Sequence, residues 1–305
     1  MSIESVIDAE YTDAVDARLA SYDAYIKYQV QEARRAIPFL SKFFSIQGAR
    51  VLEVGTGRGG KGIAYANEGM KVTALDVDLP SLELGEQAAR ARGASIHFLA
   101  GDGAALPFPR EHFDAILLDS VIEHVLDPRA LLQECKRVLK RGGIVFVVFP
   151  PYYGPLSGHI DDYIMIPWFH LLPRRIVRKT LLARPRRAEI LTPRDAFEVY
   201  ATLNGLTIFA FKHWARRAGF ATSYLRVRPF LTHPGMRLAA GLVSAIRQPP
   251  RGQNLRAVFS RARREFDLGT LALFILLSAI APLVFIPFAQ EIAAGGCKVV
   301  LRKPL

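Results

Sequence analysis

Short apolar runs alternate with amphipathic stretches across residues 49–148. Such an alternation is typical of an α/β protein, in which the apolar runs form buried β-strands. The runs predict strands over residues 50–54, 71–76, 95–99, 113–119 and 143–148. Strands that alternate with helices form mostly parallel sheets with helices on both faces. The pattern therefore predicts an α/β fold.

Helices are predicted on both sides of this region. Residues 14–44 predict one or two helices, because aromatic and aliphatic side chains recur near helical spacing. A helix over residues 128–140 is predicted to end at Arg141-Gly142-Gly143, with basic residues in its last turn. The alternation then resumes with a helix over 207–219, a strand over 221–227 and a last strand over 297–302.

Residues 150–204 interrupt the alternation and are rich in proline, aromatic residues and arginine. This composition predicts an inserted cap. Its basic residues are Arg174, Arg175, Arg178, Lys179, Arg184, Arg186 and Arg187.

A second interruption contains the apolar stretch 268–290, which has no charged residue. The stretch is long enough to cross a bilayer core, which takes about 20 apolar residues. However, Pro282 and Pro287 interrupt it, and the strand predicted over 297–302 must return to the same sheet as the core. We therefore expect a buried or membrane-surface segment in preference to a transmembrane span.

The two halves of the chain differ strongly in charge. Residues 1–150 hold 17 Lys and Arg against 20 Asp and Glu, whereas residues 151–305 hold 23 against 8. A basic surface of this size attracts phospholipid headgroups, nucleic acid or phosphorylated substrates, and solvated arginines without a partner are the alternative. Cys135 and Cys297 have no histidines at ligand spacing, so neither a disulfide framework nor a metal site is predicted. Residues 1–17 are acidic and unlike an export signal, which favours a cytoplasmic location.

A glycine-rich turn follows the first predicted strand, at residues 55–60. Glycines permit a tight turn and let the backbone approach a ligand closely. The spacing of Gly55, Gly57 and Gly60 also satisfies the dinucleotide pattern, so the glycines alone do not separate nicotinamide from S-adenosylmethionine. Glu53 favours the latter, because a carboxylate repels a pyrophosphate and attracts a sulfonium.

With Glu53 and these glycines, the chain resembles the class I S-adenosylmethionine-dependent methyltransferases of the type 11 branch. Asp76 ends the second predicted strand, where the family's acid binds the ribose hydroxyls. Asp102, in Gly101-Asp102-Gly103, is similar in position to the family's adenine-binding aspartate. Residues 114–125 resemble the fourth strand and the segment after it, and residues 139–143 resemble the family's Leu-Lys-Pro-Gly-Gly turn, with Arg141 in place of proline. The resemblance covers residues 48–150 well, and 207–220 and 296–303 loosely.

The resemblance implies a Rossmann-like core with a mostly parallel seven-stranded sheet, helices on both faces and inserted helical cap segments. It also implies S-adenosylmethionine as cofactor. The cofactor-binding residues that it implies are Glu53, Gly55, Thr56, Gly57, Asp76, Val77, Gly101, Asp102, Gly103 and Ser120.

The expected organisation has a core interrupted by two insertions. A helical segment precedes the core, and the first insertion is expected on the acceptor side. The expected segments are 1–47 (helical cover), 48–150 (cofactor-binding core), 151–206 (first insertion), 207–230 (core continuation), 231–295 (second insertion) and 296–305 (last strand).

Methyl transfer from a sulfonium is an in-line displacement, so aligning the reactants and excluding water matter more than a base. A base would help a hydroxyl acceptor. The catalytic candidates near the expected pocket mouth are His124, Tyr152 and His159, with Tyr153 beside them, and ordinary packing is the alternative for each.

The acceptor is not determined by the sequence. Residues 149–153 resemble the Asn/Asp-Pro-Pro-Tyr motif of amino-methylating DNA enzymes, but Phe149 cannot accept the amino hydrogen bonds and the motif follows the fifth predicted strand instead of the fourth. Residues 158–173 are similar to an acceptor-side insertion of some bacterial type 11 enzymes. The basic second half and the apolar stretch 268–290 together favour a small-molecule or lipid-linked acceptor at an anionic membrane surface, on the inner face of the membrane.

Three alternative functions remain. A nucleic-acid methyltransferase or binder would use the basic half, although no RNA-binding module is recognisable. A nicotinamide-dependent oxidoreductase is opposed by Glu53 and by the lack of a Tyr-x-x-x-Lys motif. A non-catalytic member of the fold is opposed by the intact set of acids and glycines. The oligomeric state is not predicted.

Overall fold

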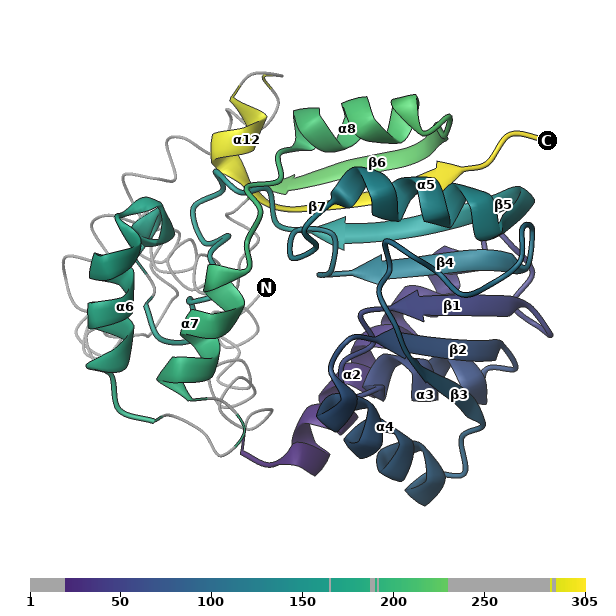
Figure 1. Ribbon diagram of the computed structural model, residues 1–305, viewed down its shortest axis with the longest axis horizontal. Helices are drawn as coiled ribbons and strands as arrows, with labels where there is room; N and C mark the ends of the chain where they lie inside the picture. The colour runs from purple at the N-terminus through teal and green to yellow at the C-terminus, as the bar shows by residue number, and fades with distance from the viewer. Residues whose placement is uncertain (1–19, 165, 187–189, 191, 230–285, 287–288) are drawn as a thin grey trace, which may run out of the picture.

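The structure is a computed structural model that describes residues 20–164, 166–186, 190, 192–229, 286 and 289–305. Its centre is a seven-stranded sheet with the strand order β3-β2-β1-β4-β5-β7-β6 (Figure 1). The strands are β1 (Arg50–Val54), β2 (Lys71–Asp76), β3 (Ile96–Ala100), β4 (Phe113–Asp119), β5 (Leu139–Phe149), β6 (Ala221–Pro229) and β7 (Ala294–Arg302). Only β7 runs antiparallel to its neighbours, β5 and β6. This architecture is the class I methyltransferase fold that the sequence predicts.

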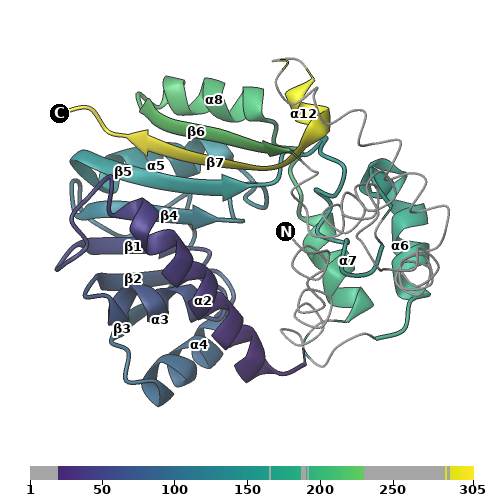
Figure 2. The ribbon, with the colours of Figure 1, turned by 180° about the vertical axis from the view of Figure 1, so that it is seen from behind.

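Helices cover both faces of the sheet. The helices are α2 (Tyr22–Leu40), α3 (Gly60–Asn67), α4 (Leu79–Ala91), α5 (Pro128–Val138), α6 (Arg174–Leu182), α7 (Pro193–Ala201), α8 (Ile208–Arg217) and α12 (Gln290–Ala293), with a 3-10 turn at Phe169–Leu171. Helices α5 and α8 lie on the face toward the viewer in Figure 1, and α2 crosses the opposite face, seen in Figure 2.

The central strands are apolar on both sides, and successive residues of each strand belong alternately to two apolar clusters. Leu52 and Ile116 join the cluster beneath α5 and α8, whereas Val51 and Ala115 join the cluster beneath α2 and α3. Successive side chains of a strand point to opposite faces, so a strand buried on both sides is a continuous apolar run. This is why the strands of the core are readable from sequence.

Residues 150–204 form a separate helical unit beside the sheet. Helices α6 and α7 lie to the left of the strands in Figure 1 and pack on each other through a small apolar cluster that includes Val177, Leu181 and Tyr200. A capping box at Thr192 and Asp195 starts α7. The segment lies on the side where β1, β4 and β5 end, so it faces the carboxyl edge of the sheet.

The predicted end of α5 is wrong. The helix ends at Val138, Leu139 is already extended, and Arg141-Gly142-Gly143 belongs to β5 instead of a helix stop. Gly142 has φ +72° at an irregularity where the β4 pairing passes from Leu139 to Ile144. The positive φ that a C-cap glycine would supply is therefore used for a bulge within the strand.

Other boundaries differ by a few residues. Strand β3 starts and ends one residue later than predicted, and β7 begins at Ala294, three residues before the predicted start, because it pairs with β6 along this length. Residues 1–19 and 230–285 lie outside the described residues, and with them lie Arg187 and most of the apolar stretch 268–290. Within the part of the chain that the structure describes, no helix is long and apolar enough to cross a bilayer.

Candidate functional site

The strand order reverses between β1 and β4, and the segments that leave these strands diverge at the carboxyl edge. Open α/β sheets bind ligands at such a point. The turn after β1 has positive φ angles at Gly55 (+67°), Gly57 (+52°) and Gly59 (+71°). A Cβ on Gly55 would lie 2.4 Å from Val121, whereas a Cβ on Gly57 would meet nothing within 4 Å. Gly57 therefore borders open space that a ligand could fill.

Glu53 is the buried acid of this edge, with 6% of its surface exposed. Thr56 donates a hydrogen bond to Glu53 Oε2 at 2.9 Å. A Cβ on Gly62 would lie 2.9 Å from the same oxygen, so only glycine lets α3 lie this close. Burial raises the pKa of Glu53 to about 7. A cation beside this carboxyl would favour its ionised form.

A charged pair lies beside Glu53. Lys61 Nζ on α3 lies 2.7 Å from Asp119 Oδ2 at the end of β4. Burial opposes the charge on Lys61, but the Asp119 carboxylate outweighs it and the pKa of the lysine is raised. The pair therefore joins α3, the helix that follows β1, to the end of β4. The sequence pattern assigned neither residue a role, although Asp119 ends a predicted strand.

Asp76 at the end of β2 organises the glycine turn. Gly57 N donates to Asp76 Oδ2 at 2.6 Å and Asp78 N donates to Oδ1 at 3.0 Å. A carboxylate has further lone pairs, so both oxygens can still accept bonds from a ligand. Val77, next to Asp76, is 73% exposed, so an apolar side chain stands open at this edge.

The remaining predicted cofactor residues lie on the neighbouring turns. Gly101 N donates to Asp76 O at 2.9 Å, which joins the turn after β3 to β2. Asp102 Oδ1 accepts from Ala104 N at 2.9 Å. A Cβ on Gly103 would lie 2.8 Å from Leu131. Ser120, directly after β4, has φ +59°, which is unusual for a residue with a side chain. The predicted residues therefore gather along one edge of the sheet.

Two of the three catalytic candidates come together after β4 and β5. The rings of His124 and His159 lie 4.9 Å apart, and His159 Nε2 lies 3.4 Å from Glu123 Oε1. Glu123 is 2% exposed, and burial raises its pKa. Burial lowers the pKa of His124 to about 4, so its imidazole is neutral. Glu123 lies in the segment 114–125 that resembles the family, but the resemblance gave this residue no role.

The loop that carries Glu123 and His124 is held by the segment after α7. Asn204 Nδ2 donates to Ile122 O at 2.8 Å and to Val125 O at 2.9 Å. His124 Nδ1 lies 2.8 Å from Thr202 Oγ1, whose own proton goes to Val199 O at 2.7 Å. A hydroxyl that has given away its proton can only accept, so Nδ1 carries the histidine proton and Nε2 has a free lone pair.

Tyr152 lies apart from this cluster. Its ring packs edge-on against Tyr153 and His170, at centroid distances of 5.4 Å and 5.6 Å. His170 Nε2 contacts the Tyr152 carbonyl at 2.8 Å. The contacts around Tyr152 are those of an aromatic packing position.

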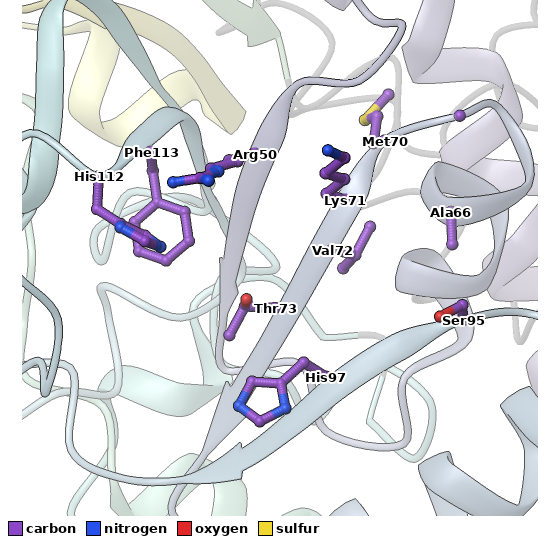
Figure 3. A pocket seen from close by; sticks show the side chains of 11 residues that line it. Arg50, Ala66, Met70, Lys71, Val72, Thr73, Ser95, His97, His112 and Phe113 are labelled. Atoms are coloured by element: carbon purple, nitrogen blue, oxygen red, sulfur yellow. The ribbon is translucent and has the colours of Figure 1, made fainter.

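A pocket of about 510 Å³ lies at the opposite edge of the sheet (Figure 3). Its lining includes Arg50, Lys71 and Phe113, which are the first residues of β1, β2 and β4. The pocket is therefore at the amino ends of the strands and apart from the glycine turn.

Comparisons with known proteins agree with the fold. Residues 52–147 match the type 11 family model of a methyltransferase domain. A demethylmenaquinone methyltransferase of Renibacterium salmoninarum is 37% identical over 123 residues, which cover 40% of this chain and 50% of that protein. The ubiquinone/menaquinone biosynthesis C-methyltransferase UbiE of Vibrio vulnificus is 33% identical over 134 residues, which cover 42% and 50%. A ubiquinone biosynthesis O-methyltransferase of Chelativorans is 33% identical over 129 residues, covering 41% and 48%. The chain thus spans about half the length of the curated relatives it matches.

Solved structures share the fold at low sequence identity. An S-adenosylmethionine-dependent methyltransferase of Methanosarcina mazei matches with a TM-score of 0.50 and 18% identity, covering 88% of this chain and 98% of that one. The cyclase SpnF matches with a TM-score of 0.50 and 17% identity, covering 95% and 84%. One fold hosts more than one activity, so these matches speak for the architecture alone.

Proposed function

Because residues 52–147 form a class I methyltransferase domain of the type 11 branch, whose cofactor is S-adenosylmethionine, we propose that the whole chain transfers a methyl group from this cofactor to a quinone-type or other lipid-linked small molecule. One observation carries the proposal. The buried acid Glu53, the open glycine Gly57 and the acid Asp76 lie together where the strand order reverses.

These residues fit the cofactor's chemistry. When bound, S-adenosylmethionine supplies an electrophilic methyl group on a cationic sulfur. Glu53 offers a buried carboxyl to that cation, and Asp76 offers acceptor lone pairs to ribose hydroxyls. Val77 offers an exposed apolar surface to the base, with Asp102 on the next turn. Gly55, Thr56, Gly101, Gly103 and Ser120 shape the surrounding backbone.

The acceptor is proposed to lie between the carboxyl edge and the helical unit of residues 150–204. His124 and His159 lie there and are the candidate bases. Tyr152 is a weaker candidate for a base, because its ring packs against that of His170. The relatives carry the names of C- and O-methyltransferases of quinone biosynthesis, which supports a quinone-type acceptor without choosing the atom.

The surface of α6 supports a lipid-linked acceptor. Leu171, Leu172 and Ile176 are exposed beside the basic residues of this helix. Exposed apolar side chains next to basic ones suit an anionic membrane surface, where each basic residue contributes about 1 kcal/mol. Peripheral attachment at the inner face of the membrane is therefore part of the proposal.

The test is methyl transfer with radiolabelled S-adenosylmethionine. The acceptors are a demethylated quinol with an isoprenoid tail, the same ring without a tail, and total bacterial lipid extract. Label in the tailed quinol or in a lipid of the extract supports the proposal. Label in the tailless ring alone contradicts the lipid-linked part. Label in none, from a protein that binds the cofactor, contradicts the proposed acceptor class.

A further inference from the structure

Glu123, His124 and His159 lie together and are here called the Glu-His-His cluster. The proposed function places the two histidines beside the acceptor but gives the three residues no role as a group. We propose that this cluster binds one divalent cation of the zinc class, with a coordination position left open for an oxygen of the acceptor. The inference rests on the proposed function only for the identity of that oxygen, since cation binding can be measured without cofactor.

The donor atoms of the three side chains lie close enough to share one cation. Three ligand atoms, one from each residue, lie within 4.8 Å of one another. His159 Nε2 and His124 Nε2 lie 3.4 Å and 4.0 Å from Glu123 Oε1. Ligands around a tetrahedral zinc ion, with bonds of about 2.1 Å, are about 3.4 Å apart. The cluster would therefore close on a cation by shifts of about 1 Å or less.

The donor atoms face one another without making hydrogen bonds. Among the described residues, neither carboxylate oxygen of Glu123 has a hydrogen-bond partner, and neither has the Nε2 atom of His159. Glu123 is nevertheless 98% buried, as its exposed fraction of 2% means. Its ion pair with His159 spans 3.4 Å and forms only while that imidazole is protonated. A buried carboxylate without a hydrogen bond is costly, and a cation would satisfy it.

His124 is also oriented as a metal ligand would be. Its Nδ1 proton goes to Thr202 Oγ1, which leaves the Nε2 lone pair on the side of Glu123. Metal-binding histidines nearly always donate their other ring N–H in this way, which fixes the tautomer. Thr202 is in turn fixed by Val199 O.

The backbone of His159 has φ +54°. A residue with a side chain is strained in this region, and such strain clusters at functional sites. The strained residue here is the one that brings the second imidazole to Glu123.

The donor set indicates the cation and its use. Two imidazoles and one carboxylate are the three protein ligands of catalytic zinc sites, which leave a fourth position for water or substrate. A cation held by the cluster would lower the pKa of a hydroxyl bound at this fourth position. The hydroxyl would release its proton to solvent, its oxygen would bond to the methyl carbon, and the sulfur would keep the electron pair of the broken S–C bond. The cluster therefore fits a hydroxyl or phenol acceptor.

The test is titration of the full chain, without a histidine tag and after chelation, with Co²⁺ and then Zn²⁺. We expect one Co²⁺ per chain, the visible absorption of a tetrahedral site, and displacement by Zn²⁺. Glu123→Gln and His159→Asn should weaken binding more than about 100-fold, since loss of a second-shell partner alone costs about 10–100-fold. Asparagine suits the positive φ of residue 159. Thr202→Val should weaken binding about 10-fold or more.

His213→Gln is the matched control, because His213 is an exposed histidine of α8 far along the chain from the cluster. It should bind Co²⁺ as the wild type does. A folded wild-type chain that binds no cation, or a Glu123→Gln variant that binds it unchanged, would overturn the inference. Acetohydroxamate, an oxygen ligand, should shift the Co²⁺ spectrum, and an unchanged spectrum would contradict the open position.

The same preparations report on the proposed function separately. Binding of S-adenosylmethionine without binding of a cation overturns the inference and leaves the cofactor assignment standing. Binding of a cation without binding of S-adenosylmethionine supports the inference and contradicts the cofactor assignment.

Discussion

Glu53 couples the stability of the protein to pH. Its pKa is raised from 4.5 to about 7 in the fold, mainly by burial, so the folded state holds the proton more tightly than the unfolded state. The resulting stabilisation is complete below pH 4.5 and is lost as the pH rises to about 7. We expect the free energy of unfolding to fall by about 3 kcal/mol across this window relative to Glu53→Gln. Urea titration of both proteins at a series of pH values measures the difference, and identical curves would contradict it.

The same carboxyl should make cofactor affinity depend on pH. A cationic ligand favours ionised Glu53, so binding must release the proton below about pH 7. S-adenosylmethionine should therefore bind more tightly as the pH rises toward 8, and Glu53→Gln should lose this part of the pH dependence. Calorimetry in buffers of different ionisation enthalpy detects the released proton.

Substitution of Gly57 tests whether the cofactor occupies the open space beside it, and Gly93 is the matched control position. Both have positive φ, +52° and +64°, and a Cβ on either meets nothing within 4 Å. Alanine at either position should cost about 1 kcal/mol of stability through backbone strain. Only Gly57→Ala should also weaken S-adenosylmethionine binding, by about tenfold or more, because its methyl group would enter the cofactor space. Thermal unfolding and calorimetry separate the two effects. Equal cofactor binding in both variants would place the cofactor elsewhere.

Single residues differ in how far the sequence predicts them. Glu53, Asp76 and Asp102 were predictable because each ends a strand or follows it, and the carboxyl ends of parallel strands meet at one edge. Lys61 and Thr202 were not, because their partners Asp119 and His124 lie far away in the chain and come close only in the fold.

At the scale of elements, the loop after β4 depends on the segment after α7. Asn204→Ala removes three hydrogen bonds, those donated to Ile122 O and Val125 O and the one accepted from Leu206 N, and should cost about 1–3 kcal/mol of stability. Because this loop carries Glu123 and His124, the variant should also bind Co²⁺ more weakly and yet keep its affinity for S-adenosylmethionine. Urea titration and the two binding assays test this. Loss of both ligands together would mean that Asn204 supports the whole carboxyl edge.

The elements themselves were largely predictable, because strands buried on both faces are continuous apolar runs and the helices begin at capping residues such as Asp127 and Thr207. The end of α5 was not. A glycine after a basic turn predicts a helix stop, but the same positive φ serves the bulge at Gly142. Local sequence does not distinguish these uses, since the choice depends on pairing with β4.

At the scale of the molecule, the basic charge of residues 151–305 should bring the protein to anionic lipid. We expect the full chain to co-sediment with vesicles that contain phosphatidylglycerol and to be released by salt. Arg175→Glu with Lys179→Glu, on α6, should reduce binding strongly. Arg216→Glu with Arg217→Glu, on α8, makes the same change of charge and should reduce it less. If the two double variants reduce vesicle binding equally, the protein is attracted to lipid by its overall charge and α6 is not a specific membrane-binding face.

The excess of basic residues in the second half of the chain was predictable from the sequence, whereas the position of these residues on the surface was not. Burial decides which apolar side chains remain open, and it leaves Leu171, Leu172 and Ile176 exposed beside the arginines of α6. The apolar stretch 268–290 remains a prediction, since most of it lies outside the described residues.

The central claim is that S-adenosylmethionine binds at the carboxyl edge of the sheet, at the glycine turn after β1 and beside Asp76 at the end of β2. Calorimetry of S-adenosylmethionine and of NAD against the wild type, Asp76→Ala and Asp78→Ala tests it most directly. Asp78 starts α4 two residues beyond Asp76, so its variant controls for local loss of stability. The account predicts micromolar binding of S-adenosylmethionine to the wild type and to Asp78→Ala, and loss or strong weakening in Asp76→Ala. Binding of NAD instead, or of neither compound by a folded chain, would contradict it.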